Sequence, residues 1–280
     1  MRGGRLVGFG FAGVNGGGHY WIVQNVPAGD AAVSEIELTW PLPPQGRQSA
    51  VHEVHVWSAV LLRPEMDYVE ALDTLSESER ERSRRFHFER DRKSFIARRA
   101  LLRSVLARYL NIAPAEIRLA FEERGKPTLF PPGGAQRLHF NFTHSRNLAL
   151  CAVCEHSPVG VDVEKIRPMP ELSEIAATFC SPEERASIHS SHGEKKLDAF
   201  FSVWTRKECY LKGTGEGIAG SLAQIDCMTS PPPWTIHALS PAPRYVGAVA
   251  VTGADARLCC WRWPVGEQRN SPVAIEMAHR

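Results

Sequence analysis

The sequence contains no apolar run as long as the roughly eighteen residues that a helix needs to cross a bilayer. It also has little net charge, because 33 basic residues nearly balance 31 acidic ones for a formal net charge of +2. Such a balance gives no general attraction to nucleic acid or to a membrane surface. We therefore expect a cytoplasmic protein whose partners include neither nucleic acid nor membrane.

The seven cysteines form no regular disulfide framework. Cys151 and Cys154 are spaced like metal ligands, but they lie in the apolar run LALCAVC without a second pair at a zinc-ribbon distance. We interpret this pair, and also Cys259 with Cys260, as strand residues. Reduced thiols in a cytosolic protein fit this pattern best.

The chain of 280 residues, with 43% apolar and 23% charged residues, is typical of a globular protein with one large or two modest domains. Residues 1–50 are rich in Gly and Pro and lack a lasting period, which indicates an extension or linker. We expect an N-terminal lobe at residues 51–158, a C-terminal lobe at 159–270 and a tail at 271–280.

The order of predicted elements occurs twice. Ser76 begins a helix with a Ser-x-x-Glu capping box, and Ser181 begins another. A long helix follows each, with Phe95 and Phe200 at the same distance from the two serines, and each unit also carries strand-like segments. This repetition predicts an α+β protein with two similar lobes, each a long helix on a small, mostly antiparallel sheet. The cleft between them is the expected ligand site.

Asp162 and Glu164, in VGVDVEK, point to the same side of a predicted strand. Two carboxylates on an otherwise apolar strand would repel each other unless a cation lay between them. Oxygen ligands without nearby His or Cys favour Mg²⁺, which often joins carboxylates to substrate phosphates. A strand end emerging into solvent explains the pair equally well.

Glu208 could add a third carboxylate from the helix FFSVWTRKECYLK, which we expect Gly213 to end. Lys212 lies four residues further along and therefore on the same helical face. The alternative is an ordinary solvent-facing ion pair, worth a few tenths of a kcal/mol.

Two segments could bind phosphate. Arg124, Gly125 and Lys126 place two cations around a glycine that lets the backbone approach a ligand, although a charged hairpin turn would look the same. Residues 80–108 are rich in Arg and Lys, which suits an anionic ligand, an acidic protein partner or simply a solvated helix surface.

Hydrogen-bonding side chains crowd the end of the next predicted strand, at Asn141, Thr143, His144 and Ser145. His144 could contact a phosphate oxygen, although a lone histidine is more often structural.

Four motifs in this order resemble the large, two-lobed 4′-phosphopantetheinyl transferases, often called Sfp-type. They are GKP at 125–127, FNFTHS at 140–145, GVDVEKIRP at 160–168 and WTRKECYLKGTGEG at 204–217. The resemblance covers roughly residues 54–265 and implies the pseudo-twofold, two-lobed fold of that family. It also implies transfer of phosphopantetheine from coenzyme A to a serine of an apo acyl or peptidyl carrier protein, with release of adenosine 3′,5′-bisphosphate.

The same resemblance assigns roles to residues. Asp162, Glu164 and Glu208 match the family's acidic triad, which holds Mg²⁺, or Mn²⁺ in its place, and Glu208 matches the proposed general base. Lys212 would neutralise a phosphate oxygen as a catalytic group together with His144. The residues expected to bind coenzyme A are Arg82, Arg124, Gly125, Lys126, Asn141, Thr143, His144 and Lys212.

One position departs from the family pattern, since Glu79 stands where some members carry a second cation, for which Arg80 and Arg85 could compensate. Two other functions stay open: a Mg²⁺-dependent phosphoanhydride hydrolase acting on a nucleotide, and an inactive module that binds coenzyme A or a carrier. A two-lobed chain can complete its own cleft, so we expect a monomer.

Overall fold

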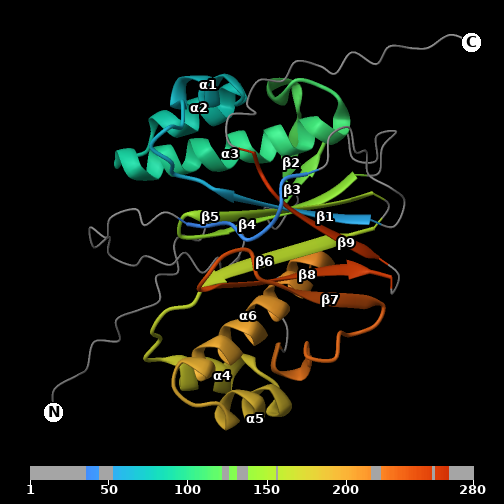
Figure 1. Ribbon diagram of the computed structural model, residues 1–280. Coiled ribbons are helices and arrows are strands. Elements are labelled where there is room, and N and C mark those ends of the chain that lie inside the picture. The colour runs from blue at the N-terminus through green and yellow to red at the C-terminus, as the bar shows by residue number, and fades with distance from the viewer. Residues whose placement is uncertain are drawn as a thin grey trace, which may run out of the picture. The chain divides into compact units, whose positions relative to one another are not determined.

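The computed structural model describes residues 36–43, 53–121, 126–130, 138–155, 157–215, 222–253 and 256–264. These residues form helices and small sheets in the expected α+β arrangement (Figure 1). None of the helices in these ranges has the length and apolar character needed to cross a membrane.

The N-terminal lobe is a four-stranded sheet in the order β4-β5-β1-β9, covered by helices on one face (Figure 1). Strand β1 runs antiparallel to β5 and parallel to β9. The strands and helices of this lobe are β1 (Glu53–Val60), α1 (Tyr68–Asp73), α2 (Glu77–Arg84), α3 (Glu89–Leu110), β4 (Leu138–Ser145), β5 (Leu148–Glu155) and β9 (Arg257–Arg262). A short turn of 3₁₀ helix, η1 (Pro114–Glu116), and a hairpin of β2 (Leu119–Phe121) and β3 (Pro127–Leu129) follow α3.

The C-terminal lobe is a three-stranded antiparallel sheet in the order β6-β8-β7, with its helices on the opposite side from the N-terminal lobe (Figure 1). Its elements are β6 (Val159–Lys165), α4 (Leu172–Phe179), α5 (Pro182–Ser190), α6 (Glu194–Thr214), η2 (Leu222–Gln224), β7 (Trp234–Leu239) and β8 (Tyr245–Thr252).

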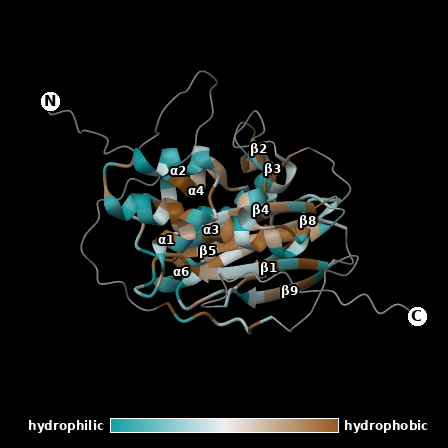
Figure 2. Cartoon of the chain, turned by 90° about the horizontal axis from the view of Figure 1, so that it is seen from above, coloured by the Kyte–Doolittle hydropathy of each residue, from teal (hydrophilic) through white to brown (hydrophobic). Residues whose placement is uncertain are grey.

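The two sheets pack against each other, which explains why the central strands are apolar on both faces. In β5, Leu148, Leu150 and Ala152 join a core with the β6 residues Val161 and Val163. The alternate β5 residues pack toward α3 instead. Figure 2 shows the resulting pattern, with hydrophobic residues on the strands of the first sheet and a mostly hydrophilic α2.

The prediction that four of the cysteines are strand residues is confirmed. Cys151 and Cys154 lie in β5 on opposite faces, in different cores, and both are buried. Cys259 and Cys260 lie in β9. All seven cysteines are present as thiols rather than disulfides.

The internal repeat extends to a buried ion pair. The capping boxes predicted at Ser76 and Ser181 are both formed. In the N-terminal lobe the capping glutamate, Glu79, accepts from Arg103 Nε at 2.6 Å, and Arg103 also donates to the carbonyls of Pro114 and Ile117 beside η1.

In the C-terminal lobe Glu184 takes the place of Glu79 and lies 2.8 Å from Lys207 Nζ. Lys207 donates to the carbonyls of Leu222 and Ile225 beside η2. One buried cation therefore connects each long helix to its capped helix and to the following 3₁₀ turn. This is expected for two lobes of common design.

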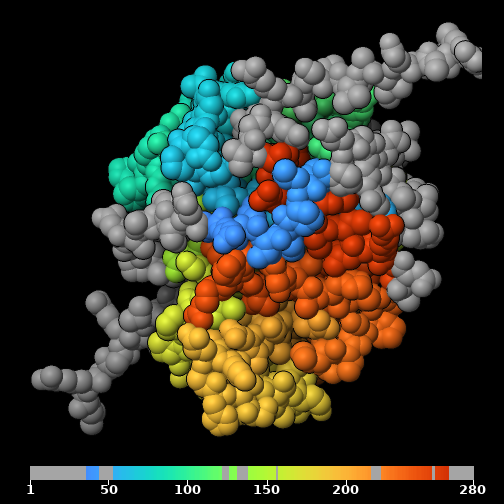
Figure 3. Space-filling view, in the orientation of Figure 1, coloured from blue at the N-terminus to red at the C-terminus, as the bar shows by residue number. Residues whose placement is uncertain are grey.

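Two features lie outside the expected division into segments. Strand β9 follows the strands of the C-terminal sheet in the sequence, but it pairs with β1 of the N-terminal sheet. Within the expected extension, residues 36–43 pack on the compact unit: Thr39 Oγ1 donates to the carbonyl of Ser240 at 2.7 Å, and Arg262 N–H donates to the carbonyl of Pro41 at 2.9 Å. Figure 3 shows this segment, in blue, lying across the C-terminal part of the chain.

Candidate functional site

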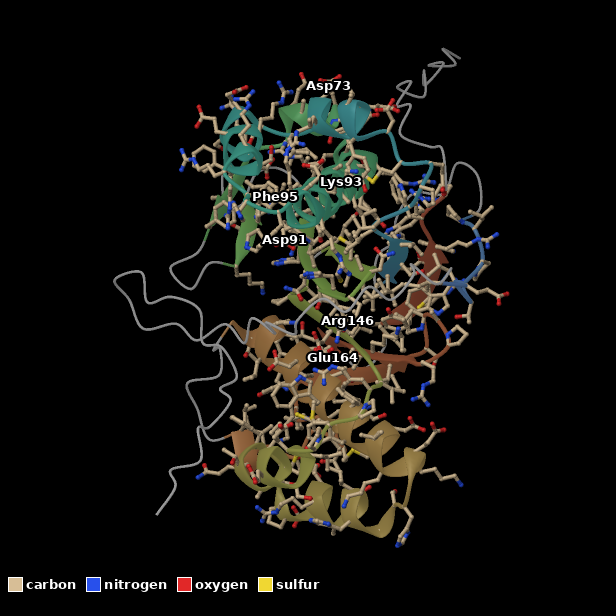
Figure 4. All side chains as sticks on the ribbon, turned by 90° about the vertical axis from the view of Figure 1, so that its left-hand side faces the viewer. Asp73, Asp91, Lys93, Phe95, Arg146 and Glu164 are labelled. Carbon is tan, nitrogen blue, oxygen red and sulfur yellow. The ribbon has the colours of Figure 1, made fainter. Side chains whose placement is uncertain are left out.

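The acidic strand residues lie where the two lobes meet. Strands β4 and β6 belong to different sheets, and side chains of β4 connect them. Thr143 Oγ1 donates to Asp162 Oδ1 at 3.0 Å, and Ser145 Oγ donates to Glu164 Oε2 at 2.7 Å. Asp162 and Glu164 share one face of β6, as predicted, and Figure 4 shows Glu164 between the two lobes near Arg146.

Helix α6 approaches β6 closely because glycines face each other. A Cβ on Gly160 would lie 2.0 Å from the carbonyl oxygen of Cys209, and a Cβ on Gly213 would lie 2.5 Å from the Trp234 ring. The prediction that Gly213 ends the helix is wrong, since α6 continues to Thr214 and Gly215 caps it with φ of 78°. Gly213 therefore allows α6 to pack closely against its neighbours and does not end the helix.

This close approach places the α6 side chains against the acidic strand. Lys212 Nζ donates to Asp162 Oδ1 at 2.6 Å and to Thr143 Oγ1 at 3.3 Å. Burial alone would lower the pKa of Lys212, but the carboxylates of Asp162 and Glu208 outweigh burial and raise it. Lys212 is therefore a cation held inside the site rather than half of a surface ion pair.

The positive charge that the protein supplies at this site does not fully neutralise the ionised carboxylates. Burial and the charge of Asp162 raise the pKa of Glu164 to about 7. Burial, opposed by Lys212 and reinforced by Asp162, raises the pKa of Glu208 to about 7. Among the described residues, the buried Asp162 Oδ2 has no hydrogen-bond partner. An orphaned carboxylate oxygen in an all-oxygen donor set fits a hard divalent cation.

The three carboxylates do not form a closed cluster. Within the described ranges, only Glu53, His55 and Cys259 form a group of three metal-type ligands whose ligand atoms all lie within 4.8 Å of one another. That group lies in the N-terminal core, where His55 contacts the Tyr109 hydroxyl at 2.7 Å and Glu53 at 3.1 Å. Both ring nitrogens of His55 are thus engaged within the protein, as in a hydrogen-bonded core network.

The predicted phosphate-binding residues are partly assembled here. Lys126 Nζ donates to the carbonyl of Lys212 at 2.6 Å, which brings the GKP segment to the end of α6. Arg124 and Gly125 lie outside the described residues. Asn141 is buried, and its Oδ1 accepts from Val161 N–H at 2.9 Å, so the amide joins the lobes.

His144 faces the long helix of its own lobe. Arg98 Nη1 donates to His144 Nε2 at 2.9 Å. His144 is exposed at the surface, yet desolvation by its neighbours together with the charges of Arg98 and Lys212 lowers its pKa well below its ordinary value. The imidazole is therefore neutral near pH 7, and with Nε2 accepting, its hydrogen is on Nδ1.

Sequence reasoning missed Arg98 and Arg99. Burial and the charges of Arg99 and Arg82 lower the pKa of Arg98 to about 10. Burial also lowers the pKa of Arg99, against the opposing effect of Glu79. Arg82, which was predicted, lies 5.4 Å above the Phe95 ring in the same group. The strongly basic composition of residues 80–108 was the available signal, but it did not say which arginine contacts His144.

Glu79, the residue that departs from the family pattern, has a structural role. It caps α2 and lies 3.6 Å from Arg99 as well as pairing with Arg103. Arg80 donates to the carbonyls of Leu72 and Asp73. Its guanidinium is therefore engaged at α1 instead of replacing a missing cation in the site.

Comparisons with known proteins give matches in both lobes of the chain. The sequence model of the 4′-phosphopantetheinyl transferase superfamily matches residues 158–245, and that of the 4′-phosphopantetheinyl transferase N-terminal region matches residues 63–156. The chain is 38% identical over 237 residues to the 4′-phosphopantetheinyl transferase HetI of Nostoc sp., covering 81% of this chain and 100% of HetI.

More distant relatives match shorter regions. The 4′-phosphopantetheinyl transferase Sfp of Bacillus subtilis is 32% identical over 145 residues, which are 52% of this chain and 62% of Sfp. The L-aminoadipate-semialdehyde dehydrogenase-phosphopantetheinyl transferase of Homo sapiens is 30% identical over 173 residues, with 59% of this chain and 56% of the human protein covered.

Proposed function

Because the chain belongs to the 4′-phosphopantetheinyl transferase superfamily, we propose that it transfers 4′-phosphopantetheine from coenzyme A to a serine of an apo acyl or peptidyl carrier protein. In this reaction the serine oxygen forms a bond to the β-phosphorus of coenzyme A. The bond from that phosphorus to the bridging oxygen breaks, and adenosine 3′,5′-bisphosphate leaves. One observation carries the proposal: Asp162, Glu164 and Lys212 converge between the lobes, where β4 contacts β6. We call this contact between the lobes the seam.

Asp162, Glu164 and Glu208 are the residues that would hold Mg²⁺, or Mn²⁺ in its place. When bound, the divalent cation neutralises charge on the pyrophosphate and on the leaving phosphate. The orphaned Asp162 Oδ2 and the raised pKa of both glutamates support this assignment, because a cation would relieve both.

Glu208 is our proposed proton acceptor for the serine hydroxyl, directly or through water. Burial raises the pKa of this carboxyl, and a bound cation would lower it again and so keep the carboxylate ionised and able to accept the proton. The proton passes to the Glu208 carboxylate as the new oxygen–phosphorus bond forms.

The surrounding cations would bind the phosphates. Lys212 lies beside Asp162 and is charged, so it would neutralise a pyrophosphate oxygen. Neutral His144 would donate from Nδ1, while Arg98 holds its other nitrogen. Arg82 and Lys126 are proposed ligands of the 3′-phosphate. The basic surface of residues 80–108 would favour encounter with an acidic carrier protein.

We further propose that the enzyme works as a cytoplasmic monomer. Seven cysteines present as thiols are consistent with a reducing compartment. Both lobes of the one chain contribute side chains to the seam, so no second copy is needed to supply them.

The reaction is tested by quantifying adenosine 3′,5′-bisphosphate released from coenzyme A, with Mg²⁺ and with or without an apo carrier. Transfer predicts release that needs both the carrier and the metal. Release at the same rate without any carrier would indicate a phosphoanhydride hydrolase instead. Glu208→Gln should abolish release while leaving coenzyme A binding largely intact; undiminished turnover would remove Glu208 as the base.

A further inference from the structure

The seam between β4 and β6 is built from alternate side chains of β4. Asn141, Thr143 and Ser145 each reach a group of β6, in register along the two strands. Asn141 contacts the backbone of β6, whereas Thr143 and Ser145 contact its two carboxylates. The strands therefore meet through side chains, and two of these contacts end on the proposed metal ligands.

Ser145 has a hydrogen-bonding arrangement that fixes the direction of its proton. The backbone N–H of Lys165 donates to Ser145 Oγ at 3.1 Å. A hydroxyl group has a single hydrogen, and an amide N–H can only donate. Ser145 therefore directs its hydrogen at Glu164 Oε2, which it contacts at 2.7 Å, and this bond is charge-assisted when Glu164 is ionised.

Ser145 is itself held rigidly. It is buried and is the last residue of β4, where it pairs with Leu148 across the hairpin. The hairpin turn is anchored by Asn147, whose side chain accepts from Leu62 N–H at 2.6 Å and donates to the Leu62 carbonyl at 2.9 Å. The hydroxyl thus offers a fixed point to a glutamate side chain that would otherwise exchange between rotamers.

We propose that Ser145 is a positioning residue that holds the Glu164 carboxylate in the orientation needed to bind the divalent cation. The inference rests on the proposed function. Ser145 would touch neither the cation nor coenzyme A, and would act by restricting Glu164 before the cation arrives. Preorganised ligands bind more tightly because less conformational freedom is lost on binding.

The test measures Mn²⁺ binding by the full chain directly, from the electron paramagnetic resonance signal of unbound Mn²⁺. Ser145→Ala should raise the Mn²⁺ dissociation constant about tenfold, as expected for the loss of one charge-assisted hydrogen bond. Ser145→Thr keeps the hydroxyl and should restore most of the affinity. Metal-free binding of coenzyme A, followed by calorimetry, should be unchanged in both variants.

The matched control is Ser58→Ala, a fully buried strand serine whose hydroxyl donates to the Trp261 carbonyl. It should bind Mn²⁺ like the native protein. Native affinity in Ser145→Ala would overturn the inference, and so would equal weakening in Ser145→Ala and Ser145→Thr, because packing rather than the hydroxyl would then be responsible. If the native protein bound no Mn²⁺ and transferred nothing, the proposed function itself would fall.

Discussion

Replacing Lys212 with methionine tests whether this lysine is an internal substitute for metal charge. Lys212 Nζ lies 2.6 Å from Asp162 Oδ1, and the two side chains are 25% and 5% exposed. Exposed ion pairs contribute about 0–1 kcal/mol, whereas breaking a buried pair costs about 3–5 kcal/mol. For this half-buried pair we expect Lys212→Met to lower the free energy of unfolding by about 2 kcal/mol in the absence of metal.

The expected loss depends on pH and on metal. Lys212 lowers the pKa of both Glu164 and Glu208, so its removal raises each further. A carboxyl with a raised pKa in the folded state destabilises the fold progressively as pH rises from its ordinary value toward the raised one. The difference between variant and native protein should therefore be larger at pH 8 than at pH 5.5, and Mg²⁺ should stabilise the variant more than the native protein.

The assay is urea denaturation at both pH values, with and without Mg²⁺. The control is Lys195→Met, an exposed lysine in the first turn of the same helix, which should change stability little. If Lys212→Met were as stable as native protein at pH 8 without metal, or gained no more from Mg²⁺, the interpretation of Lys212 as compensating charge would be refuted.

Three further expectations concern the lobes, the histidine and the N-terminal segment. Lys207→Met should lower the free energy of unfolding by about 3–5 kcal/mol, because it leaves a buried carboxylate uncompensated. Urea denaturation measures this loss, and a loss under about 1 kcal/mol would contradict the expectation. His144 should remain neutral down to pH 5.5 in an NMR titration, and Arg98→Ala should raise its pKa; titration near its ordinary value in native protein would contradict the assigned contact. Deleting residues 1–43 should give a lower thermal midpoint than deleting residues 1–35, because only the longer deletion removes the apolar side chains of residues 36–43 that pack on the core. Equal midpoints for the two deletions would show that this packing contributes nothing.

The features that sequence predicted well depend on local spacing. The capping boxes, the long helices and the shared face of Asp162 and Glu164 follow from helix and strand periodicity, which acts over a few residues. The repeat was visible for the same reason, and the structure extends it to the buried pairs of Arg103 and Lys207.

The features that sequence did not predict depend on contacts between distant residues. Parallel pairing of β9 with β1 joins residues about two hundred positions apart, which no local pattern encodes. Gly213 gave a helix-end signal, but contact with Trp234 decided its role. Arg98 could be selected from its basic neighbours only once α3 had packed beside His144.

The central claim, transfer of phosphopantetheine to a carrier protein, is tested most directly by the intact mass of apo carrier domains. Each carrier would be incubated with the protein, coenzyme A and Mg²⁺, and then measured by mass spectrometry across carriers from fatty-acid, polyketide and peptide synthesis. We predict a gain of one phosphopantetheine group on the carrier serine, absent with EDTA and with Glu208→Gln. No mass gain on any carrier would contradict the account.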